Sequence, residues 1–235
     1  MDQPNTSPFR KEHCAHCAFK SPLFKLLSED ELELMNRNRH EVMYNPGEVI
    51  FKQGSPLTHV ISYNFGLAKM QVEGKNGNRL ILRLVKPVEF ICGMGLFTDS
   101  RNQFSLIAVK KSSVCYIDKE NFLQVLHSNK TFLEAFLHLI EKLHARNLSK
   151  ILNHNEKHAA GRVAESLLYL SGEIFSSNSF DTHLSTQELA ELSGISRESA
   201  FKVLNDLSGQ GVISREGSQF SILNPSMLQT ISRNG

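Results

Sequence analysis

The hydrophobic pattern of this chain changes its period once, near Asp118, and that change constrains the fold more than any other feature. Between Glu41 and Asp118, short runs of apolar residues are separated by Gly, Pro and Asn, which is typical of strands joined by tight turns. After Asp118, apolar residues recur at helical spacing. The chain therefore divides into an N-terminal β region and a C-terminal region that is mainly helical.

The β region contains a series of short predicted strands. They are Val42–Tyr44, Val49–Phe51, His59–Tyr63, Leu67–Val72, Arg79–Val85, Leu106–Val109 and Ser113–Ile117. The turns between them include Asn45-Pro46-Gly47 and Gly74-Lys75-Asn76-Gly77, where Asn and Gly accept a positive φ at low cost. This arrangement predicts an all-β sandwich or roll.

A long helix is predicted from about residue 129 to residue 154. It carries a stripe formed by Phe136, Ile140, Leu143 and Asn147. Such a stripe suits either a helix that packs on its own domain or one that pairs with a second copy of itself. Asn147 favours the pair, because a polar residue in the seam can fix the register of two helices. We therefore expect a homodimer.

The last third of the chain has the signals of two short helices followed by a β-hairpin. Ser185-Thr186-Gln187-Glu188 forms a capping box that begins the first helix. Gly194 provides a tight turn, and Ser196 can cap the second helix. Gly211–Arg215 and Gln219–Ile222 then form the hairpin. This order predicts a helix-turn-helix with a wing, although a helical hairpin without DNA contacts has similar local signals.

The outer face of the second helix is polar, as a helix that enters a DNA groove requires. The candidate DNA-binding residues are Ser196, Arg197, Glu198, Ser199 and Lys202, with Arg215 in the wing. From Asn155 to Gly235, however, six Lys and Arg stand against nine Asp and Glu. The prediction of DNA binding therefore depends on local geometry and not on the overall charge of this segment.

Three stretches carry a resemblance to a known family. They are Pro46-Gly47-Glu48-Val49-Ile50-Phe51, Gly95-Leu96-Phe97 and Ile195-Ser196-Arg197-Glu198-Ser199. In this order, from about Cys14 to Ile231, the chain resembles the Crp-Fnr family of bacterial transcription regulators. The resemblance implies a homodimer that binds double-stranded DNA at an inverted repeat under the control of an effector or redox signal. RNA polymerase is a candidate further partner.

The resemblance also implies an α+β architecture of successive parts. These are a Cys-containing N-terminal segment (1–20), a β-roll sensor domain like the cyclic-nucleotide-binding jelly roll (21–128), a dimerisation helix (129–154) and a winged helix-turn-helix DNA-binding domain (155–235). The expected effector pocket comprises Cys92, Gly93, Met94, Gly95, Arg101 and Gln103.

The residues at this pocket differ from those of the members that bind cyclic AMP. Those members have a Gly-Glu pair that holds the ribose and an Arg-Ser pair that holds the phosphate, whereas this chain has Cys92-Gly93 and Gln103-Phe104. Arg101 lies near the second pair, but no carboxylate near Gly93 restores the ribose contact. Burying a phosphate without a cation is strongly disfavoured. We expect that cyclic AMP does not bind, while another small ligand remains an option.

The four cysteines suggest a second kind of signal. Cys14 and Cys17 form a C-x-x-C pair, and Cys115 matches the strand where Fnr-like oxygen sensors carry a cluster ligand. Those sensors have a third N-terminal cysteine where this chain has Leu23, and Cys92 is a candidate replacement. The four thiols could hold an iron-sulfur cluster or zinc, or Cys14 and Cys17 alone could have a redox or zinc role. Cys92 and Cys115 also suit ordinary buried positions without a cofactor.

Two other classes of function have weaker support. A cupin-like metal-dependent enzyme needs several converging His, and the strand region supplies only His59. A ligand-binding module without DNA activity does not account for the helix-turn-helix and wing. The polar segment 1–12 lacks the apolar run of a signal peptide, and no apolar stretch approaches the length of a membrane span. We therefore expect a cytoplasmic regulator without enzymatic activity.

Overall fold

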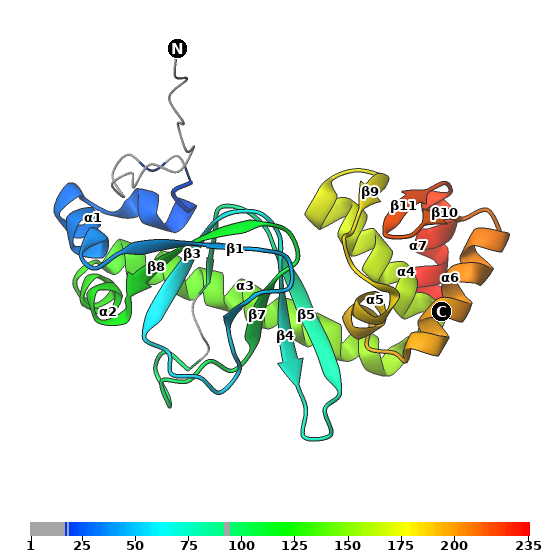
Figure 1. Cartoon of the computed structure of the whole chain (residues 1–235), viewed down its shortest axis with the longest axis horizontal. Helices are drawn as coiled ribbons and strands as arrows, with labels where there is room; N and C mark the ends of the chain where they lie inside the picture. Colours follow the sequence, from blue (N-terminus) through cyan, green and yellow to red (C-terminus); the bar gives the residue numbers. More distant parts are fainter. Residues whose placement is uncertain (1–16, 18, 92–94) are drawn as a thin grey trace, which may run out of the picture.

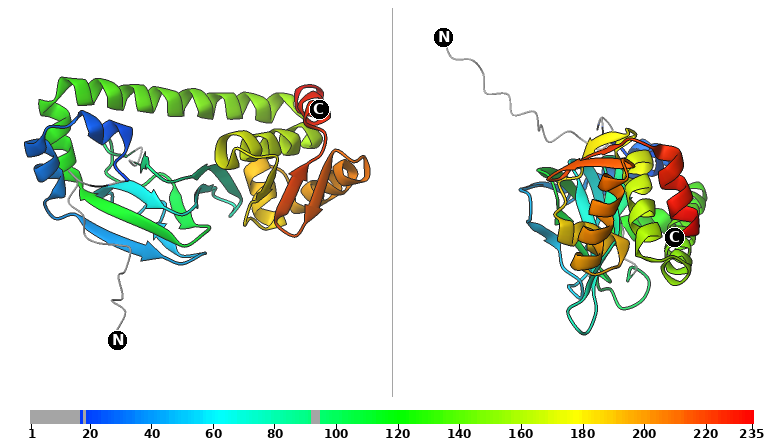
Figure 2. Two further views of the ribbon diagram at one scale, coloured as in Figure 1. Left: turned by 90° about the horizontal axis from the view of Figure 1, so that it is seen from above. Right: turned by 90° about the vertical axis from the view of Figure 1, so that its right-hand side faces the viewer.

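The protein consists of a β-roll and a smaller C-terminal domain connected by one long helix (Figure 1). The computed structural model describes residue 17 and residues 19–91 and 95–235, with the side chains of 153–155 left out. Viewed from above in Figure 2, the long helix runs along the roll and reaches the C-terminal domain. The α+β class and the order of β-roll, helix and helix-turn-helix predicted from the sequence are confirmed.

The roll is built from two four-stranded antiparallel sheets. The first has the order β1 (His40–Tyr44), β8 (Ser112–Asp118), β3 (His59–Phe65), β6 (Glu89–Ile91). The second has the order β2 (Val49–Phe51), β7 (Ser105–Ala108), β4 (Ala68–Glu73), β5 (Arg79–Val85). The sequence pattern missed β6, a three-residue strand that pairs with β3. Strands so short show too little alternation for a period to be recognised.

Helices close one end of the roll around an aromatic cluster. They are η2 (Pro22–Leu26), α1 (Glu29–Asn36), α2 (Lys119–Ser128) and the start of α3 (Lys130–Glu156). Ser28 begins α1 with a capping box that the sequence analysis did not identify. Phe24, Phe122, Phe132 and Phe136 pack together in this cluster, with ring centroids 5.6–6.2 Å apart. This burial ties the first part of α3 to the roll.

The 27-residue helix α3 connects the roll to the C-terminal domain. It extends two residues beyond the predicted end. Among the described residues, no helix combines the length and the apolar character that crossing a membrane demands.

The C-terminal domain combines four α-helices with a small sheet. Its elements are α4 (Ala159–Tyr169), the π-helical turn η3 (Leu170–Phe175), β9 (Ser179–Asp181), α5 (Thr186–Ser193), α6 (Arg197–Gly209), β10 (Ile213–Glu216), β11 (Gln219–Ile222) and α7 (Pro225–Asn234). The predicted polar loop at 176–182 contains strand β9, which pairs with β11 and makes the wing sheet three-stranded. Phe180 is buried there against Phe220, a contact between distant residues that local composition does not reveal.

The two parts share apolar packing. Leu67, Ile81 and Leu84 of the roll belong to the same buried cluster as Leu189 and Leu192 of α5. The β4–β5 hairpin therefore packs against α5, which links the roll physically to the C-terminal domain.

Candidate nucleic-acid interface and sensor cavity

The two helices of the helix-turn-helix begin and end as their sequence signals predict. Ser185 and Glu188 form the capping box at the start of α5. Gly194 follows α5 in the left-handed conformation with a φ of 63°, where a residue with a Cβ is strained. The next helix, α6, then starts at once, and Ala190 and Ala200 are fully buried where the helices cross. Small side chains permit this close crossing.

The exposed face of α6 carries the residues predicted to read DNA. The Ser196 side chain accepts a hydrogen bond from the Ser199 amide at 3.1 Å and so caps the helix. Arg197, Glu198 and Lys202 are exposed. The opposite face, with Leu204 and Leu207 among others, is buried. The helix therefore presents its charged side chains to solvent, ready for contact with a partner.

One exposed residue of α6 was missed by the sequence analysis. Phe201 lies on the outer face and is 55% exposed. The signal was available, because Phe201 is four residues after Arg197 and so lies on the same side of the helix.

The wing residue Arg215 is engaged within the domain. Its guanidinium donates to the Thr186 hydroxyl at 2.6 Å and to the Gly217 carbonyl at 3.1 Å. It also lies 5.5 Å from the centre of the Phe220 ring. Burial lowers the pKa of Arg215 from its ordinary value. These contacts hold the wing against the start of α5, and the DNA contact expected of Arg215 stays a prediction.

Polar contacts add to the apolar link between the roll and the C-terminal domain. Lys69 Nζ on β4 lies 2.6 Å from Glu188 Oε1 on α5, and the Leu84 amide donates to the Tyr169 hydroxyl at 3.0 Å. Burial alone would raise the pKa of the Glu188 carboxyl, but hydrogen bonds from Lys69 and Ser185 outweigh burial and lower it. The carboxylate that caps the first helix of the motif is thus also held by the roll.

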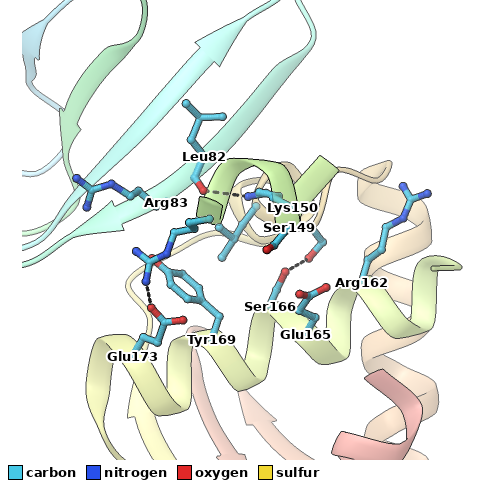
Figure 3. A pocket seen from close by; sticks show the side chains of 12 residues that line it. Leu82, Arg83, Ser149, Lys150, Arg162, Glu165, Ser166, Tyr169 and Glu173 are labelled. Atoms are coloured by element: carbon cyan, nitrogen blue, oxygen red, sulfur yellow. Dashed lines mark hydrogen bonds and ion pairs between the residues drawn. The ribbon is translucent and has the colours of Figure 1, made fainter. Parts of the chain in front are cut away.

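A cavity of about 330 Å³ lies at this junction (Figure 3). Lys150 of α3 reaches across it and donates to the carbonyls of Ile81 and Leu82, at 2.6 and 3.1 Å. Burial lowers the pKa of Lys150 to about 8. Figure 3 also shows Glu173 paired with an arginine, which is Arg146. The residues that line this cavity therefore connect the roll, α3 and the C-terminal domain through ion pairs and hydrogen bonds.

A second cavity, of about 210 Å³, lies between the roll and α3 and is called the sensor cavity here. Its described lining is mostly apolar and aromatic, with Phe90, Phe104 and Phe136 among the residues. Arg83 supplies a cation, which is paired with Glu89, and its buried Nε has no hydrogen-bond partner among the described residues. The cavity therefore has a mostly apolar wall with one arginine among its lining residues, and this arginine also lines the cavity at the junction.

The predicted effector residues do not all face the sensor cavity. Arg101 donates to the Gly54 carbonyl at 2.7 Å and Gln103 donates to the Asp99 carboxylate, and both side chains lie at the surface. Gly95 allows a tight loop, because a Cβ there would lie 2.1 Å from the Arg101 carbonyl oxygen. Cys92, Gly93 and Met94 lie outside the described residues.

The predicted dimer seam faces the protein's own roll. Phe136 is 2% exposed in the roll core, and Ile140, Leu143 and Asn147 line the sensor cavity. Ile140, Leu143 and Asn147 are half-buried, so the roll covers this stripe only in part, and its role as a dimer seam stays a prediction. The apolar residues of α3 that are exposed are instead Leu137, Leu148, Ile151 and Leu152.

The described cysteines do not form a metal site by themselves. Cys115 on β8 is buried, and its Sγ accepts a hydrogen bond from Arg39 at 3.2 Å. Cys17 is half-buried, while Cys14 and Cys92 lie outside the described residues. In the part of the chain that the structure describes, no three His, Cys, Asp or Glu side chains are grouped to hold a metal.

The roll contains one His pair. His40 on β1 lies beside His59, with ring centroids 5.2 Å apart, and both rings contact Tyr116. Burial is the main reason that the pKa of His59 is lowered. The strands predicted from the sequence contain only His59, and the second His does not complete a cupin-like ligand set among the described residues, because such a set needs a third ligand.

Comparison with known proteins places both domains in one family. The "Cyclic nucleotide-binding domain" family matches residues 41–129, and the "Crp-like helix-turn-helix domain" family matches residues 161–231. These matches cover the roll and the DNA-binding domain in the order in which the fold presents them.

Curated relatives match most of the chain. It is 28% identical to the cyclic AMP receptor protein of Thermus thermophilus over 82% of this chain and 88% of the relative. It is 25% identical to the nitrogen fixation regulation protein FixK of Bradyrhizobium diazoefficiens over 93% of each. The solved structure of FixK2 from Bradyrhizobium japonicum has the same fold, with a TM-score of 0.74, 18% identity and coverage of 82% of this chain and 96% of that one. The chain therefore belongs to the Crp-Fnr family of transcription regulators.

Proposed function

We propose that α6 enters the major groove of DNA and reads its sequence. The observation that carries this proposal is the exposed polar face of α6, which a capped helix-turn-helix holds on a buried scaffold. Arg197 donates two hydrogen bonds to a guanine, and Glu198 accepts one from a cytosine amino group. Lys202 bridges a base and a phosphate, and Ser196 and Ser199 provide backbone contacts at the helix start.

In this proposal Arg215 acts indirectly. Its guanidinium already binds Thr186 and lies over the Phe220 ring, so it positions the wing against the start of α5. The net negative charge of the domain is compatible with this interface, because Glu188 is paired with Lys69 and Glu191 is buried.

The regulator acts as a homodimer through α3. Support comes from the exposed apolar residues Leu137, Leu148 and Ile151, which recur at intervals that place them along one side of the helix. A second copy of the helix would remove this apolar stripe from water. Two α6 helices related by a two-fold axis would then bind an inverted repeat with half-site centres about 34 Å apart.

The signal enters through the sensor cavity or through the cysteines, and cyclic AMP is not the effector. The positions expected to hold a cyclic phosphate are occupied by Gln103 and Phe104, and Gln103 is bonded to Asp99. The aromatic wall and the Arg83 side chain, whose Nε has no partner in the described part of the chain, favour an effector with an apolar body and one hydrogen-bond acceptor. RNA polymerase remains a predicted partner at the promoter.

Site selection from random DNA tests the reading helix. The full chain and the Arg197→Ala variant are each incubated with a random library, in air and anaerobically, at a fixed salt concentration because phosphate contacts depend on salt. The wild type should enrich an inverted repeat, and Arg197→Ala should lose about 1–3 kcal/mol and relax the preference at one base pair.

A control variant, Arg37→Ala in the N-terminal region, should enrich the same repeat, because Arg37 is exposed at the end of α1. If the wild type enriches no inverted repeat in either condition, or if Arg197→Ala keeps the same base preference, α6 is not the reading helix.

A further inference from the structure

Phe201 lies on the exposed side of α6 and does not pack in the core of the C-terminal domain. At about 100° per residue, it lies about 40° around the helix from Arg197 and about 60° from Glu198, so it stands between these two charged residues. Its side chain is 55% exposed. A large apolar ring thus occupies the middle of a face that is otherwise polar.

The domain core is complete without this ring. Ala200 and Leu204 are fully buried, and Val203 packs against the same core from the side. Phe201 belongs to no buried cluster among the described residues. Exposure of the ring to water is unfavourable. A partner that covers the ring would therefore gain binding free energy from its burial.

We propose that Phe201 is a specificity-determining residue whose ring packs against the C5-methyl group of a thymine in each half-site. This inference rests on the proposed insertion of α6 into the major groove. The Phe ring has no hydrogen-bonding group, and the thymine methyl is the apolar group that unmodified bases present in that groove. The neighbouring Arg197 and Glu198 direct the same face toward the base edges.

A contact with the thymine methyl group predicts that binding weakens when the methyl group is removed, which hydrogen bonding to the base does not predict. Deoxyuridine has the same hydrogen-bonding groups as thymidine and lacks only the methyl group, so a methyl contact alone distinguishes the two. Burial of one methyl group corresponds to about a fourfold change in affinity, and two half-sites give about fifteenfold.

The experiment uses the full-length protein and the inverted repeat that it selects from random DNA. Each symmetric pair of thymines is replaced by deoxyuridine in turn, and the dissociation constants are measured for wild type, Phe201→Ala and Phe201→Leu. We expect one pair whose replacement weakens wild-type binding about fifteenfold, no such sensitivity in Phe201→Ala, and partial sensitivity in Phe201→Leu. The matched control is Leu223→Ala, which removes an equally exposed apolar side chain outside α6 and should keep the full sensitivity.

The outcomes separate this inference from the proposed function. If the wild type selects a repeat but no thymine is sensitive to loss of its methyl group, the inference is overturned and the reading helix stands. The same conclusion follows if Phe201→Ala is as sensitive as the wild type. If no repeat is selected at all, both fail. Thermal unfolding of Phe201→Ala should match the wild type, which excludes loss of folding as the cause.

Discussion

The ion pair between Lys69 and Glu188 should stabilise the junction between the roll and the helix-turn-helix. The perturbation is a double-mutant cycle with Lys69→Met and Glu188→Gln. Met keeps most of the apolar stem of Lys, and Gln retains the ability to complete the capping box with Ser185. The cycle therefore isolates the attraction between the two charges and leaves the cap of α5 in place.

The magnitude follows from the burial of the pair. The side chains are 12% and 26% exposed, and their charged atoms are 2.6 Å apart. An exposed pair contributes less than about 1 kcal/mol, whereas breaking a fully buried pair costs about 3–5 kcal/mol. We expect an interaction free energy of about 1–2 kcal/mol at neutral pH. The exposed pair of Arg79 and Glu73, with atoms 3.5 Å apart, is the matched control and should give less than about 0.5 kcal/mol.

The sign of the pH dependence is set by Glu188, whose pKa is lowered in the folded protein. The stabilisation is fully present above the ordinary value of 4.5 and is lost as the pH falls through the lowered pKa. Urea unfolding of the four proteins, at one protein concentration because the dimer equilibrium affects stability, measures the interaction at pH 7 and near pH 3. An interaction within about 0.3 kcal/mol of zero at pH 7 would refute the reasoning.

Four further predictions concern other parts of the molecule. Leu148→Glu with Ile151→Glu should convert a dimer to a monomer in sedimentation at micromolar concentration, and a wild-type mass of one chain would contradict the α3 interface. Calorimetry with millimolar cyclic AMP should show no binding, and a micromolar dissociation constant would mean that the effector positions are misaligned. If the cysteines hold a cluster, anaerobically purified protein should be brown and lose iron in Cys115→Ser; a colourless, iron-free protein after reconstitution would exclude the cluster. Gly194→Ala should lower the free energy of unfolding by about 1 kcal/mol because of the strained φ, and an unchanged value in urea unfolding would count against the strain.

Much of the DNA-binding domain could be predicted from local sequence. The capping box at Ser185, the turn at Gly194 and the cap at Ser196 act over three or four residues, so they are present in the sequence itself. The side of α6 that carries Arg197 follows from helical periodicity alone. Phe201 was missed although it obeys the same periodicity, because an aromatic residue is ordinarily assigned to the core.

The face of α3 that meets the roll could not be predicted in the same way. The helix carries two apolar stripes side by side, one with Phe136 and one with Leu137, and both have helical spacing. Which stripe is covered depends on where the sheets and α2 place Phe122 and the sensor cavity, and those positions arise from packing between distant elements.

The sequence by itself determined the kinds of element, their order and the residues that begin and end the helices of the DNA-binding motif, because these depend on interactions between near neighbours in the chain. Only the tertiary structure decided which apolar stripe is buried, where the sensor cavity lies and which charges meet. Lys69 and Glu188 are 119 residues apart, and no local sequence pattern predicts that they form an ion pair. Their contact exists because the β4–β5 hairpin packs against α5, and such long-range packing depends on the shape of the whole fold.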